Sequence, residues 1–193
     1  MRISVISAAE RYRKEDLIMA ELWEMEYLAL LAEWVEGLDP EKKNFADIYI
    51  TDAEENPALI LVPAVEEDGF SDIQLRISIT HILENTEQIQ ILTTMFGGVP
   101  ENLLREAEKV IARINEFLIL GNAAIFYEGG LIFFNHAFVI DQGMDTLLAT
   151  SLVGKTLEII TKTVPQIMEI LTPVLEGTQT ADAVIADGIG LIQ

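Results

Sequence analysis

The stretch from Ile114 to Ile140 constrains the fold of this chain more than any other part of its sequence. It holds two apolar runs, rich in Ile, Leu and Phe, on either side of Glu128-Gly129-Gly130. Two glycines between apolar runs of strand length are typical of a hairpin turn. Because the stretch begins at the end of a charged helical pattern, it predicts a helix, a strand, a tight turn and a second strand in succession.

Composition excludes several functions. A length of 193 residues, half of them hydrophobic, suits one domain with a substantial core. The net charge of −20 repels phosphate groups, so we expect neither a nucleic acid partner nor docking on anionic lipid. The absence of cysteine excludes disulfide scaffolds, thiol catalysis and the usual structural zinc sites.

The sequence also lacks the patterns that direct a chain to or across a membrane. Its N-terminus has no apolar core of the kind found in signal peptides. No apolar run reaches the roughly 18 residues that a membrane span needs. Together with the missing cysteines, these features predict a cytoplasmic protein with no membrane partner.

Three segments have the apolar periodicity of helices. The first runs from about Lys14 to Glu36, the second from Pro100 to about Glu116, and the third from near Met144 to about residue 175. Within the third, Pro165 should kink or divide the helix, and Pro173 should help to end it.

Strand patterns occupy the region between the first two helices. Phe45–Thr51, Ala58–Val65 and Ser71–Leu83 read as strands, and the last has the clearest alternation. Pro63 cannot donate to a ladder, so the second strand should be an edge strand or be broken there. The segment Glu84–Val99 fits either a short helix or a fourth extended piece.

The order of these elements predicts an α+β fold. It is an antiparallel sheet of about five strands with helices packed on it, in the order α-β-β-β-α-β-β-α. Residues 1–176 should form a single α+β domain. Residues 177–193 form a C-terminal tail that is either loose or docked as a short helix.

No catalytic motif stands out. His81 and His136 share no ligand spacing, and a metal site would require them to converge with a carboxylate such as Glu128 or Asp141. No nucleophile elbow is present, and the glycines at 97 and 98 are not followed by the lysine of a phosphate-binding loop. We therefore expect no enzymatic activity, no cofactor and no metal, with both histidines as partly exposed strand residues.

The apolar side chains leave two binding hypotheses open. The aromatic stripe of the first helix is either core, which we favour, or a surface for a second copy or a peptide. The candidate partner or dimer surface comprises Trp23, Tyr27, Trp34, Leu59 and Leu61. The rival hypothesis is a small-ligand protein or enzyme with a pocket between sheet and helices, lined by Phe126, Phe133, Phe134 and Phe138.

One segment resembles a known family. Ile114-Asn115, the link through Gly121, the strand ending at Phe126-Tyr127, the turn at Glu128-Gly129-Gly130 and the strand Leu131–Phe138 resemble the helix-to-hairpin segment of YbjN-like proteins. The order of elements over about residues 14–175 is similar to that of the related type III secretion chaperones.

The resemblance implies a non-enzymatic, chaperone-like homodimer that binds an extended polypeptide client, with no catalytic residues. Our hypothesis from the sequence is therefore a protein-binding module that captures a polypeptide segment or acts as a regulatory dimer. Capture would use apolar surface or strand addition at an open sheet edge.

Overall fold

The computed structural model describes residues 24–37, 45–51, 57–63, 74–83 and 85–188. Six antiparallel strands form one sheet in the order β1-β2-β3-β4-β6-β5. The strands are β1 (Phe45–Thr51), β2 (Ala58–Pro63), β3 (Gln74–Leu83), β4 (Thr86–Phe96), β5 (Asn122–Phe126) and β6 (Leu131–Asp141). The first helix is described over 24–37, and the others are α2 (Glu101–Asn115), α3 (Thr146–Leu175) and α4 (Ala181–Ala186). The predicted α+β class is confirmed.

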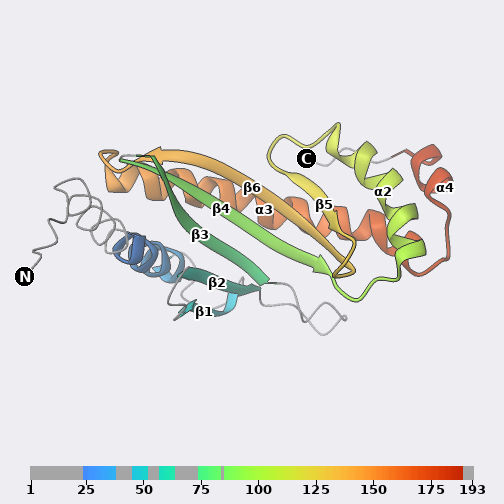
Figure 1. Cartoon of the computed structure of the whole chain (residues 1–193), viewed down its shortest axis with the longest axis horizontal. Helices are drawn as coiled ribbons and strands as arrows, with labels where there is room; N and C mark the ends of the chain where they lie inside the picture. Colours follow the sequence, from blue (N-terminus) through green and yellow to red (C-terminus); the bar gives the residue numbers. More distant parts are fainter. Residues whose placement is uncertain (1–23, 38–44, 52–56, 64–73, 84, 189–193) are drawn as a thin grey trace, which may run out of the picture.

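Helices cover one face of the sheet. Most of the alternating residues of β3, β4 and β6 that point to this inner face are buried, and Ile77, Ile91 and Phe134 are 0% exposed. α3 runs behind β4 and β6, and the first helix lies beside β2 and β3 (Figure 1). The opposite face of these strands is only partly buried or exposed.

β4 settles the alternative that the sequence left open at 84–99. Its residues alternate between buried and half-buried along the whole strand, which is the period of two that an extended chain imposes. This strand raises the count from about five to six. β2 lies between β1 and β3, so the edge position that we considered for it is wrong. β2 does end at Pro63, which is paired in register with Phe45.

α3 continues through Pro165 and ends two residues after Pro173, so a division of the helix at Pro165 is wrong. A proline removes one backbone hydrogen bond from a helix. Buried side chains on both sides of it, including Val164 and Ile167, hold the helix against the core and offset that loss. No helix in the described ranges is long and apolar enough to cross a membrane.

The C-terminal tail adopts the docked alternative over α4. Ala181 is fully buried and Val184 is 8% exposed. The Thr180 hydroxyl accepts a hydrogen bond of 3.2 Å from the Ala183 N–H and caps the start of α4. α4 packs against α2.

Candidate protein-binding surface

Most of the predicted surface residues are core residues. Tyr27 is 3% exposed, and Leu59 and Leu61 are 0% exposed. These values correct our interpretation of the three as partner surface, because the chain buries them against its own helices and sheet. Burial raises the pKa of Tyr27 to about 12, opposed in part by a hydrogen bond to Thr150 of α3. Trp23 lies outside the described residues.

Trp34 packs on α3 and is partly buried. A Cβ atom on Gly154 would lie 1.6 Å from Cη2 of the Trp34 ring, so the ring sits directly on the glycine backbone. The contact joins the first helix to α3. This contact within one chain is sufficient to explain why an aromatic residue occupies position 34.

The four phenylalanines of the rival pocket lie on two different faces of the sheet. Phe126 pairs with Leu131, so it shares a face with Phe133. Phe134 and Phe138 differ from Phe133 by odd numbers of residues and point to the inner face. One pocket lined by all four is therefore wrong.

The two histidines also lie apart. Nδ1 of His81 is 2.8 Å from Oε1 of Glu87, a fully buried carboxylate. Nε2 of Gln142, which precedes α3, donates to the same oxygen. His136 pairs with Ile91, four residues further along β4 than Glu87, and burial lowers its pKa. Within the ranges that the structure describes, no three His, Asp or Glu side chains gather as a cation site.

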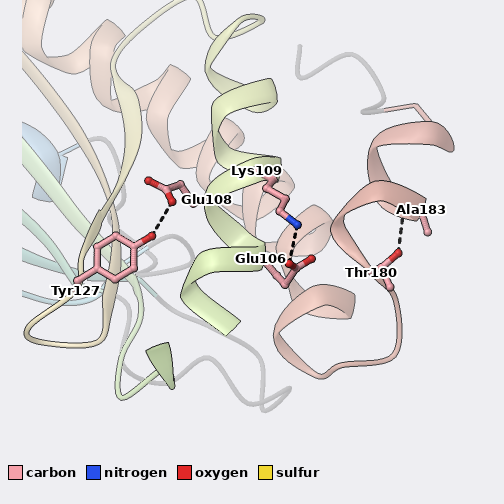
Figure 2. A network of polar contacts seen from close by, with 6 residues as sticks. All are labelled: Glu106, Glu108, Lys109, Tyr127, Thr180 and Ala183. Carbon is pink, nitrogen blue, oxygen red and sulfur yellow. Dashed lines mark hydrogen bonds and ion pairs between the residues drawn. The ribbon is translucent and has the colours of Figure 1, made fainter. Parts of the chain in front are cut away.

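One half of β6 is covered by β5, which in turn packs against α2. β5 pairs only with residues 131–135 of β6. The outer edge of β5 is closed by the Asn115 side chain, which donates to the Ala123 carbonyl at 3.0 Å and accepts from its N–H at 2.9 Å. In Figure 2, the Tyr127 hydroxyl donates to Glu108 of α2 at 2.8 Å and fixes the β5–β6 turn. This bond raises the pKa of Tyr127.

The other half of β6, residues 136–141, has no strand on the side away from β4 among the described residues. Figure 1 shows this half of the strand along the border of the sheet, beyond the end of β5. We call residues 136–141 the open edge.

The hydrogen bonds show which backbone groups face outward at the open edge. Since Asn115 takes both backbone groups of Ala123, these groups point away from β6, and the Ala123–Phe134 pair is not hydrogen-bonded. Even-numbered residues of β6 therefore direct their backbone groups to β4. The Gln142 N–H supports the assignment, because it donates to the Asn85 carbonyl on the β4 side at 3.0 Å. The N–H and C=O of Ala137 and Val139 consequently point out of the sheet edge.

An apolar stripe on α3 borders the open edge. Leu148, Leu152 and Ile159 are 61%, 41% and 41% exposed. At 3.6 residues per turn, they lie about 160° around the helix from Thr150 and Gly154, which face the first helix. The stripe therefore occupies the flank of α3 away from the first helix, on the side of β6.

The open edge carries little of the usual protection, because its one acidic residue is Asp141 at its very end. Natural edge strands are blocked by charged side chains, prolines or bulges. Residues 136–140 read His-Ala-Phe-Val-Ile, with no acidic residue, lysine or proline, in a chain of net charge −20. Val139 is 56% exposed. An edge with no acidic residue, lysine or proline before Asp141, beside an apolar helix flank, is suited to pairing with another strand.

No protein-family model matches this sequence, and no curated protein matches it. Among solved structures, the chain is similar to YbjN, a proposed transcription regulator from E. coli. The two share 15% identity over 79% of this chain and 94% of that chain, with a TM-score of 0.40. A likeness at this level carries no argument about function, and the family resemblance stays a prediction.

Proposed function

We propose that this protein is a cytoplasmic, non-enzymatic protein-binding module that pairs a polypeptide strand with its open edge. The observation that carries the proposal is the outward-facing, unprotected backbone of Ala137 and Val139. An added strand gains main-chain hydrogen bonds along an edge of this kind.

The inner-face side chains of an added strand would rest on the stripe of Leu148, Leu152 and Ile159. Burial of apolar surface contributes about 25 cal/mol per Å², so the stripe adds affinity that backbone pairing alone does not supply. The acidic surface elsewhere keeps such a complex soluble. The added strand comes from a client segment or from a second copy of the chain.

Proline substitution at Val139 tests the proposal. Val139→Pro removes an N–H that points outward and takes no part in the β4–β6 ladder, so the fold should survive. Binding of a fluorescently labelled, permanently unfolded polypeptide, such as reduced and carboxymethylated α-lactalbumin, is followed by anisotropy. We expect at least about a tenfold loss of affinity in Val139→Pro.

Val139→Thr is the matched control, because it keeps the N–H and the branched shape and should bind as the wild type does. Thermal unfolding of both variants checks that the fold is intact. Equal binding by Val139→Pro and Val139→Thr would overturn the proposal. A second outcome would also overturn it: the wild-type protein binds no polypeptide, and the Val139 amide exchanges rapidly with solvent at every protein concentration. The open edge would then be paired with neither a client segment nor a second copy.

A further inference from the structure

We infer that the strand at the open edge is supplied by a second copy of this chain, through antiparallel pairing of β6 with β6 about a twofold axis at Val139. The inference rests on the proposed function and names the partner. It is carried by the length of the open edge, the direction of its backbone groups and the position of the α3 stripe.

The ends of the open edge fix the register. A symmetric antiparallel pair places residue i opposite residue j with i + j constant, so the axis passes through the middle of the paired segment. The segment between the last β5 partner, Asn135, and the turn at Gln142 has its middle at 138–139. An axis at Val139 pairs all three outward-facing residues, 137, 139 and 141, whereas an axis at Phe138 would place Asp141 against Asn135 of the second copy, which β5 already occupies. An axis at Ala137 would place Val139 against Asn135 of the second copy, which β5 already occupies.

Side chains are compatible in this register. On the face of the sheet opposite the helices, Val139 lies opposite Val139 of the second copy, and Asp141 lies opposite Ala137 of the second copy. The two Asp141 carboxylates are four residues apart along the strands, about 13 Å, which exceeds the Debye length of about 8 Å at physiological salt. Phe138 and Ile140 lie opposite one another on the inner face. A chain of charge −20 thus meets its copy with no carboxylate opposite another in the strand pair.

α3 extends the contact. Val139 lies about 7 Å before the end of β6, and residue 150 lies about 6 Å after the start of α3. Both residues are therefore at a similar distance from the connection between β6 and α3, and a twofold axis at Val139 passes close to residue 150. Leu148 and Leu152 flank it on the side of β6. The axis brings these leucines next to those of the second copy, which removes the most exposed part of the stripe from water.

Disulfide cross-linking tests this geometry, because the chain has no cysteine of its own. Directly opposed hydrogen-bonded residues in antiparallel strands have Cα atoms about 5.5 Å apart, within the span that a disulfide bridges. We expect Val139→Cys to form a covalent dimer under mild oxidation. Ala137→Cys faces Asp141 of the second copy and Thr80→Cys lies on β3, so neither should link.

Sedimentation of the unmodified chain gives a second readout. We expect twice the 21.5 kDa mass of one chain, and a return to 21.5 kDa in Leu152→Glu. Gln179→Glu adds the same charge at an exposed position away from the stripe and should stay dimeric. Equal cross-linking of all three cysteine variants, or a monomeric wild type, would overturn the inference. If the monomer still bound unfolded polypeptide with the sensitivity to Val139→Pro described above, the proposed function would stand without it.

Discussion

Gly154→Ala should destabilise the protein, although the same change usually stabilises a helix. Replacing glycine by alanine inside a helix normally adds about 1 kcal/mol to its stability. At this position the new Cβ would lie 1.6 Å from Cη2 of Trp34, far inside any real contact. The indole must shift away from α3 to make room, and the first helix must move with it.

The magnitude follows from two opposing contributions. Inserting a methyl group into packed surroundings costs typically 1–3 kcal/mol, so about 2 kcal/mol is a fair central value. Subtracting the helix contribution of about 1 kcal/mol leaves a net loss of about 1 kcal/mol. For a protein of this size, that lowers the Tm by roughly 2–4 °C.

A double-mutant cycle isolates the contact. In a Trp34→Ala background the obstacle is gone, so Gly154→Ala should raise the free energy of unfolding by about 1 kcal/mol, with the opposite sign. Urea unfolding of the four proteins gives the coupling. If Gly154→Ala stabilises both backgrounds equally, the ring does not rest on Gly154, and Trp34 returns as a candidate for the partner surface.

Three further results are expected. Phe134→Ala should lower the free energy of unfolding by about 3–5 kcal/mol in urea, because the ring is fully buried; a loss below 1 kcal/mol would contradict its core position. His136 has a pKa below the ordinary value of 6.5, so the unfolded state binds a proton at this residue first, and the free energy of unfolding declines as pH falls below about 6.5. His136→Asn should reduce this dependence of the free energy of unfolding on pH between pH 7.5 and 5, relative to the wild type. Tyr27 has a pKa raised from 10.0 to about 12, so its contribution is complete below pH 10 and is lost as pH rises toward 12; Tyr27→Phe, measured alongside the wild type, should remove this alkaline slope.

The sequence predicted those elements whose two faces differ cleanly. β3 and the β5–β6 hairpin were predicted because apolar residues alternate or flank paired glycines. β4 was ambiguous because its faces are mixed. Glu87 and Thr93 lie on the buried face, while Leu92 lies on the other, so neither the strand period nor the helix period dominates.

The candidate surface was only partly accessible from the sequence. Strand addition at an open edge was among our hypotheses, yet the residues named for it were wrong for Tyr27, Leu59 and Leu61, which are buried. An apolar residue looks the same in a sequence whether its own chain or a partner covers it. The open edge depends on where β5 stops relative to β6, a tertiary relation that no local pattern encodes.

The short length of β5 has a consequence for how this architecture can change. Continued backwards in register, the segment at 116–121 would pair with 136–141 and cover the whole border of the sheet. Instead it leaves α2, and the chain enters β5 at Gly121, whose positive φ of 67° and missing side chain let the ring of Phe134 approach. Inserting about six residues before Gly121 would supply an internal strand for that border. The length of the loop between α2 and β5 therefore decides whether the open edge is filled by the chain's own strand or can pair with a strand of another polypeptide.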